Sequence, residues 1–224
     1  MKINQSKNVE RILLTGICLL IVFLFYKTID KLSFVYDVMH HGLIFSNALD
    51  VLVGKTPYRE VFIQYGLLGT LFNSFALYVS DLNSISIIFL LAVFYFSSVI
   101  LVGFSTASLT NSSYMVLALI IFLFNHPIPW YPWPNYISFF FLVLAVYLFT
   151  EKNLLKLFLS GIFFSLACLV RENFFYFIIP SVIIINILIY AFNKKINKNI
   201  ALISGFLLPL LIFVIYLLSN DLFN

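Results

Sequence analysis

Short groups of polar residues interrupt this apolar sequence, and the first of them is YDVMHHG at 36–42. It holds the carboxylate of Asp37 three and four residues before the imidazoles of His40 and His41, a spacing that brings side chains together along a helix. A carboxylate that is desolvated beside apolar surface can act as a general base. The alternative is structural, because Asp is a preferred helix N-cap and interfacial histidines commonly face water or lipid headgroups.

The same three residues could form part of a metal site, since carboxylate and imidazole are common ligands of metal ions. The sequence offers no evident third or fourth ligand beside them. The metal therefore stays unknown, with a divalent ion as the one cofactor to consider, and no other cofactor is evident.

A second polar group, GKTPYREVFIQYG at 54–66, directly precedes an apolar run. Arginine grips phosphate through two parallel hydrogen bonds, so this segment suggests a phosphate and sugar site at the membrane interface. The same residues also suit a helix entry at which long cations snorkel and tyrosines anchor. The candidate binding residues here are Lys55, Tyr58, Arg59, Glu60 and Tyr65.

The pair Arg171 and Glu172 stands alone, because the sequence around it carries no other charge from Leu157 to Ile185. At the centre of a bilayer each charge would cost roughly 2.5–3.5 kcal/mol. The pair must therefore lie at an interface or face a polar cavity. An ion pair that marks a helix turn is the alternative, but ionisable residues within membrane segments are functional candidates by default, so we include both residues in the candidate substrate site.

The proline-rich stretch HPIPWYPWPNY at 126–136 adds two accessory candidates, Trp130 and Trp133. Prolines restrict the backbone, so these rings could form a rigid platform that stacks on a sugar ring or a prenyl chain. An aromatic belt anchor is the more common role of tryptophan and tyrosine at a membrane interface.

The composition indicates that these residues belong to a membrane protein. Of 224 residues, 62% are hydrophobic and only 10% are charged, far from the balance of a soluble domain. The apolar residues form long runs without strict alternation, which predicts membrane helices and excludes a membrane β-barrel. The sequence has no basic stripe typical of nucleic-acid binding and no G-x-G-x-x-G, P-loop, H-E-x-x-H or G-x-S-x-G motif, so a substrate would be carried in the membrane.

We expect an all-α, polytopic transmembrane helical bundle of seven to eight helical runs, forming a single membrane domain over 1–224. The apolar runs are 11–28, 66–80, 84–104, 114–125, 135–149, 154–170, 174–192 and 200–218. Cytoplasmic loops carry an excess of lysine and arginine. Basic residues in the first eleven positions and in NKKINKN at 193–199 therefore predict a cytoplasmic N-terminus.

Counting from the basic loops places 29–65 and 126–136 outside the cytoplasm. An even number of crossings must separate these two loops, yet three apolar runs lie between them. Either 66–80 or 114–125 is therefore expected not to cross fully.

The first extracytoplasmic loop, 29–65, is predicted to contain an amphipathic interfacial helix. On a helical wheel, Val38, Ile44, Phe45, Ala48, Leu49 and Leu52 share one arc. Such a helix suits the membrane interface. Gly54 is expected to end it, and Pro57 to prevent its return.

The order of these parts resembles the GT-C class of integral-membrane glycosyltransferases, which includes protein O-mannosyltransferases and aminoarabinose transferases. The resemblance rests on a first span, an outside loop that opens with an acidic residue, PYRE, and YG entering a span. The later WPNYISFFFLVLAVYLF, LVREN and basic loop fit the same order, so the similarity covers most of 10–200.

The resemblance implies an inverting enzyme that moves a hexosyl or pentosyl group from a polyprenyl-phosphate donor to an unknown acceptor at the extracytoplasmic face. Asp37 would be the catalytic base, and Arg59 and Arg171 would stabilise the departing lipid phosphate. We expect an integral protein of a bacterial inner membrane that acts in cell-surface glycan or glycolipid assembly. Its expected partners include membrane lipid, and nucleic acid is not among them. The alternative is a lipid-linked-glycan transporter or a non-catalytic membrane subunit.

The sequence departs from the GT-C pattern in two respects. Val38 follows Asp37 where many members carry a second acidic residue, and the chain is much shorter than usual. We therefore expect it to be the N-terminal part of a longer enzyme, or a truncated form that is inactive alone.

Overall fold

The computed structural model describes residues 15–16, 18–27, 38–109, 133–150, 153–193 and 196–222. Over these ranges the regular structure is helical, apart from an isolated β-bridge between Pro57 and Val61. A short helix, Cys18–Lys27, comes first along the chain. The labelled helices are α2 (Val38–Leu52), α3 (Leu67–Val79), α4 (Ile85–Leu109), α6 (Asn135–Thr150), α7 (Leu154–Val170), the 3-10 helix η1 (Glu172–Phe174), α8 (Phe175–Asn193) and α9 (Ile196–Ser219).

The expected apolar runs match these helices closely. The runs predicted at 66–80 and 154–170 become α3 and α7 with nearly the same bounds. The run 114–125 lies outside the described residues. All-helical structure is thus confirmed for the described part of the chain, whereas the number of membrane crossings stays a prediction.

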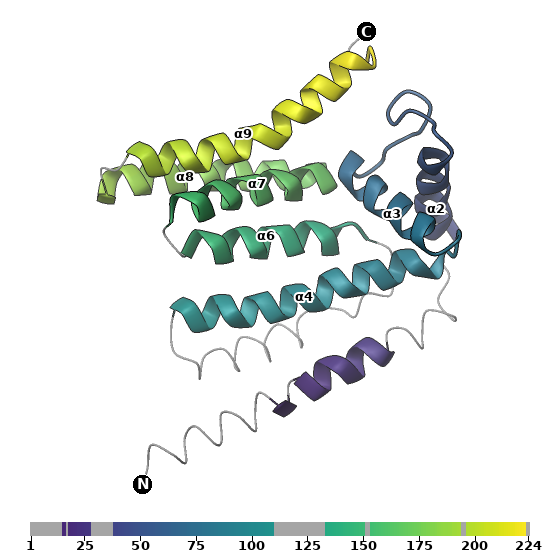
Figure 1. Ribbon diagram of the computed structural model, residues 1–224, viewed down its shortest axis with the longest axis horizontal. Helices are drawn as coiled ribbons and strands as arrows, with labels where there is room; N and C mark the ends of the chain where they lie inside the picture. Colours follow the sequence, from purple (N-terminus) through teal and green to yellow (C-terminus); the bar gives the residue numbers. More distant parts are fainter. Residues whose placement is uncertain are drawn as a thin grey trace.

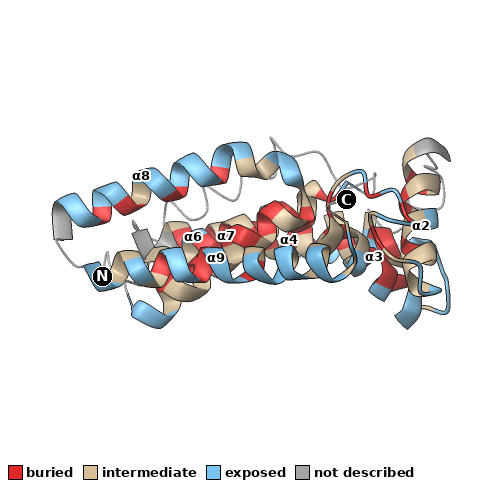
Figure 2. Cartoon of the chain, turned by 90° about the horizontal axis from the view of Figure 1, so that it is seen from above, coloured by how far each residue is buried: buried red, intermediate tan, exposed pale blue. Residues whose placement is uncertain are grey.

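Four helices lie side by side in one layer, in the order α4, α6, α7, α9 (Figure 1). The view at right angles shows α8 on one face of this layer (Figure 2). Helices α2 and α3 pack together at one end of the layer, where α6 begins and where α7 and α9 end (Figure 1). Several polar segments that are distant in sequence therefore meet at this end.

Two glycines allow α7 and α9 to pack at short range. A Cβ atom on Gly161 would overlap the carbonyl oxygen of Leu202, and one on Gly205 would overlap that of Phe158. On the other side of α7, the hydroxyl of Ser160 donates a hydrogen bond to the carbonyl of Ala145 in α6 at 2.8 Å. Small residues at helix crossings bring backbones close together, as they do in many membrane proteins.

Phenylalanine fills the contact between α3, α4 and α6. The Phe72 ring lies 5.4 Å from the Phe94 ring, and Phe94 lies 5.1 Å from Phe140, both edge to face. Phe141 stacks on Phe163 of α7 at 5.8 Å. These are preferred geometries for aromatic pairs, and they give many of the 27 phenylalanines a structural role.

The outer faces of α8 and α9 are apolar and exposed. Tyr176 is 80% exposed, Phe177 74% and Ile187 61%, and exposed residues follow α8 along most of its length (Figure 2). An apolar surface of this extent is stable in lipid rather than in water. Within the described ranges, three helical segments are long and apolar enough to cross a membrane: Ile85–Thr106, Glu172–Ala191 and Ile196–Ser219.

Helix α2 is amphipathic, as the helical wheel predicts, but its apolar face contacts protein. Ile44 and Ala48 are buried in the core cluster, and Phe45, Leu49 and Leu52 pack against it. His41 is also buried, only 8% exposed, so the alternative in which an interfacial histidine faces water or headgroups does not hold for His41. Gly54 follows the helix with φ of 94°, a left-handed conformation that glycine adopts without strain.

Candidate functional site

The candidate site lies at the end of the layer that carries α2 and α3. Its framework is the loop 53–66, which joins these two helices and is held to the rest of the protein by several hydrogen bonds. The amide of Asn47 donates to the carbonyl of Phe62 at 2.6 Å, and the backbone N–H of Glu172 donates to the carbonyl of Tyr65 at 3.0 Å. The phenol of Tyr216 in α9 donates to the carbonyl of Pro57 at 3.2 Å.

Arg171 is at the centre of an aromatic cluster. Its Cζ atom lies 5.5 Å from the centroid of the Tyr65 ring and 5.6 Å from that of Trp133. Both distances allow cation–π attraction. An Nη1 donor of Arg171 also forms a hydrogen bond with Oδ1 of Asn135 at the start of α6. Partial burial lowers the pKa of the guanidinium from its ordinary value, and the Tyr65 phenol opposes that shift.

A glycine allows this cluster to form. A Cβ atom on Gly66 would lie 2.5 Å from the carbonyl oxygen of Leu169 and 2.7 Å from that of Val170. Only a residue without a side chain fits here, so the loop can lie directly against the end of α7. The close approach brings Tyr65 next to Arg171.

Glu172 faces a different neighbour, Tyr58. The Tyr58 phenol donates a hydrogen bond to Oε1 of Glu172 at 3.2 Å, and its ring lies 6.1 Å from that of Phe213 in α9. The backbone of Tyr58 has φ of 68°, which is uncommon for a residue with a side chain. Residues in such conformations persist where surrounding contacts hold them, and they cluster at functional sites.

Burial raises the pKa of Tyr58, and the charge of Glu172 and the hydrogen bond to it raise the pKa further. Loss of the phenolic proton would leave two negative charges in contact. Tyr58 therefore stays a neutral donor at physiological pH.

A groove of about 350 Å³ opens beside this pair. Tyr58, Glu172 and Asn173 form its polar part, while Phe175, Tyr176, Phe213 and Leu169 supply rings and apolar surface. Its volume is in the range of small-molecule sites. Arg171 does not line it.

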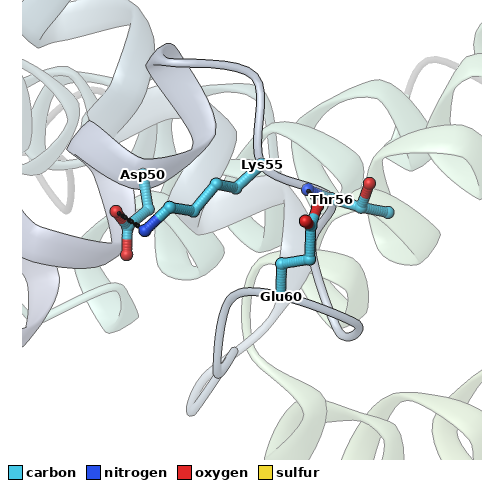
Figure 3. A network of polar contacts seen from close by, with 4 residues as sticks. All are labelled: Asp50, Lys55, Thr56 and Glu60. Carbon is cyan, nitrogen blue, oxygen red and sulfur yellow. Dashed lines mark hydrogen bonds and ion pairs between the residues drawn. The ribbon is translucent and has the colours of Figure 1, made fainter.

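Two of the remaining charges of GKTPYREVFIQYG, Lys55 and Glu60, form local contacts in the turn after α2 (Figure 3). The Nζ atom of Lys55 lies 2.7 Å from Oδ1 of Asp50, and Oε2 of Glu60 accepts a hydrogen bond from the backbone N–H of Thr56 at 2.7 Å. The contacts with Thr56 lower the pKa of Glu60. Arg59 is exposed. The structure does not bring these three candidates to the Arg171 cluster.

The accessory candidates divide between described and undescribed residues. The imidazole of His40 stacks on Trp133 with ring centroids 5.9 Å apart, so α2 reaches the Arg171 cluster. Asp37 and Trp130 lie outside the described residues. Among the described residues, no group of three or more histidine, cysteine or acidic side chains is arranged to hold a metal ion.

Comparisons with family models, with curated proteins and with solved structures find no match to this chain. Function is therefore inferred from the geometry of the site.

The sequence analysis did not single out several contributors to the site, among them Asn135, Phe213 and Tyr216. Asn135 sits two residues after Trp133 in the aromatic stretch, a position that could have marked it. The two α9 residues belong to an apolar run far along the chain, and no local pattern connects them with the loop.

Proposed function

We propose that this chain is a GT-C-type glycosyltransferase, or the membrane part of one, which transfers a sugar from a polyprenyl-phosphate donor to an acceptor at the extracytoplasmic membrane face. One observation carries the proposal. Three segments that the sequence suggests for substrate binding meet at one end of the helical layer, through Tyr58 and Tyr65, Trp133, and the pair Arg171–Glu172.

Arg171 suits the role of the phosphate-binding residue. Tyr65 and Trp133 lie over the guanidinium and Asn135 binds one of its nitrogens, so the side chain is held in one orientation. Arginine recognises phosphate through its planar edge, and a fixed cation stabilises negative charge without reorganisation. It would stabilise the lipid phosphate that leaves during transfer.

Asp37 is the proposed general base. Asp37 is three residues before His40 in the sequence, and the His40 ring stacks on Trp133 of the Arg171 cluster. In the transfer step, the acceptor oxygen forms a bond to the anomeric carbon while the bond from that carbon to the phosphate oxygen breaks. The acceptor proton passes to Asp37, and the lipid phosphate leaves with the electron pair, so the configuration inverts.

The arrangement of the helices supports the proposed topology. The loop 54–66, expected outside, and the start of α6, which follows the outside segment 126–136, share one end of the layer, while the start of α9, beside the basic segment expected inside, lies at the other (Figure 1). Helix α3 has 13 residues, about 20 Å of helix, which is short of the ~30 Å hydrocarbon core. We propose that α3 is the run that does not cross.

The test is a transfer assay with the full chain in lipid nanodiscs, using a panel of labelled polyprenyl-phosphate hexoses and pentoses. The measured quantity is the release of polyprenyl phosphate. We expect Arg171→Gln to reduce the rate about 10²-fold or more, and Arg171→Lys to reduce it less, because lysine keeps the charge but lacks the planar fork. Asp81→Asn, at an exposed position after α3, is the control and should transfer normally. Equal rates for Arg171→Gln and the wild type would remove Arg171 from the mechanism.

A further inference from the structure

Arg171 and Glu172 are neighbours in sequence, but their side chains lie in separate environments. The guanidinium lies with Tyr65, Trp133 and Asn135. The carboxylate binds the Tyr58 phenol and lines the groove of about 350 Å³. The charge pair predicted from sequence as one site is therefore two sites, one cationic and one anionic.

The polar part of the groove favours a ligand that both donates and accepts hydrogen bonds. Oε1 of Glu172 accepts from Tyr58, and a carboxylate has further acceptor positions on its second oxygen. The exposed amide of Asn173 offers two donors and an acceptor. Neighbouring hydroxyl groups on one ring match this combination.

The charge of the groove excludes the donor phosphate. A phosphate placed against Glu172 would meet a like charge with no cation among the groove residues, and like charges in contact are unfavourable. The phosphate is better accommodated on the Arg171 side.

The walls of the groove are aromatic. Phe213 packs against Tyr58 from α9, and Tyr176, 80% exposed, lines the groove from α8. Rings of this kind supply flat apolar contact area. A ligand with one apolar face and a hydroxylated edge would fill both parts of the groove.

We propose that this groove binds a neutral, hydroxyl-rich ring, namely a sugar, with its hydroxyls on Glu172 and Asn173 and its C–H face on Phe213. The role of this ring in the reaction rests on the proposed function. There the ring belongs to a sugar-bearing acceptor, because the donor phosphate is held on the Arg171 side. Glu172 and Phe213 become residues that determine acceptor specificity.

The experiment is a calorimetric titration of the full chain in nanodiscs with hexyl β-glucoside below its micelle concentration. A hexyl oligoethylene glycol ether has the same tail without the hydroxylated ring and controls for partition into lipid. We expect saturable binding of the glucoside alone. Glu172→Gln should weaken it about tenfold, the effect of losing one hydrogen bond to a charged group, and Phe213→Ala should weaken it by a similar factor.

Asp81→Asn makes the same carboxylate-to-amide change at an exposed position that does not line the groove, and it should bind like the wild type. If Glu172→Gln fails to fold, Glu172→Asp is the second variant, because it keeps the charge but withdraws the carboxylate by one methylene. Equal binding of the glycol ether, unchanged affinity in the folded Glu172 variants, or displacement of the glucoside by inorganic phosphate would overturn the proposal.

The same preparation separates this inference from the proposed function. In one outcome, the protein binds the glucoside through Glu172 and yet transfers no sugar from any polyprenyl-phosphate donor. That result would support the groove as a sugar site and reject the proposed transferase activity. Transfer without glucoside binding would reject the sugar groove and keep the transferase.

Discussion

The ring of Tyr65 lies 5.5 Å from the Cζ atom of Arg171, and this contact joins the loop 53–66 to the end of α7. The two residues come together because Gly66 has no side chain, so that the loop can rest on the carbonyls of Leu169 and Val170. The candidate site therefore requires that the start of α3 lie close to the end of α7.

Gly66→Ala should therefore disrupt the site. The added Cβ would lie 2.5 Å from the Leu169 carbonyl oxygen, and the backbone must move to accept it. We expect a loss of about 1–3 kcal/mol in the free energy of unfolding, with weaker transfer because Tyr65 leaves Arg171. Thermal unfolding in nanodiscs measures the first effect. Gly42→Ala is the control, since a Cβ there meets no atom within 4 Å, and equal midpoints for the two variants would contradict the account.

Gly205→Ala should separate α9 from α7. The new methyl group would overlap the carbonyl oxygen of Phe158. This is a backbone atom, so it cannot rotate away as a side chain could. We expect a destabilisation of about 1–3 kcal/mol, measured as a lower midpoint of thermal unfolding. Gly161→Ala strains the same crossing, so the double variant should lose less than the sum of the two single losses. Additive losses would indicate two independent contacts.

Alkaline pH should destabilise the protein through Tyr58. Its folded pKa lies above the ordinary value of 10.0, because of burial and Glu172. The stabilising contribution is therefore complete below about pH 10 and is lost as the pH rises toward the folded pKa, since the unfolded state releases the proton first. Tyr58→Phe removes this contribution. The unfolding midpoint should then fall less steeply with pH above pH 10 than in the wild type. Identical pH dependence of the two midpoints would exclude Tyr58 as the source of the alkaline destabilisation.

Thiol labelling should place both ends of α3 on one side of the membrane. Single cysteines at the exposed positions Glu60 and Ser84 are expected to react with an impermeant reagent from the same side. Cysteines at Asn153 and Asn197 should react only from the opposite side. The background carries Cys18→Ser, while the fully buried Cys168 can stay. Labelling of Glu60→Cys and Ser84→Cys from opposite sides would mean that α3 crosses.

Helix positions were predictable because each depends on a continuous apolar run. Helix α7 occupies 154–170 as expected, and Gly54 follows α2 with the left-handed φ that its type suggests. These features are local, so the residues within a single segment determine them.

The contacts of the site were predictable only in part. Tyr58, Tyr65, Arg171 and Glu172 stand out as polar residues in an apolar chain, but their pairing crosses more than one hundred positions. No local pattern indicates that Tyr58 faces Glu172 while Tyr65 faces Arg171. The burial of His41 was missed for the same reason, because it depends on how the end of the layer packs around α2.

The most direct test of the central claim is the rate of sugar transfer by Asp37→Asn in the full-length protein, with membrane insertion and unfolding midpoint measured alongside. Asp50→Asn is the matched control, because Asp50 pairs with Lys55 in the turn after α2. If Asp37 is the general base, its variant should lose about 10²–10⁴-fold in rate while it inserts and unfolds normally, and Asp50→Asn should keep its activity. Transfer by inserted Asp37→Asn at the wild-type rate would contradict the account.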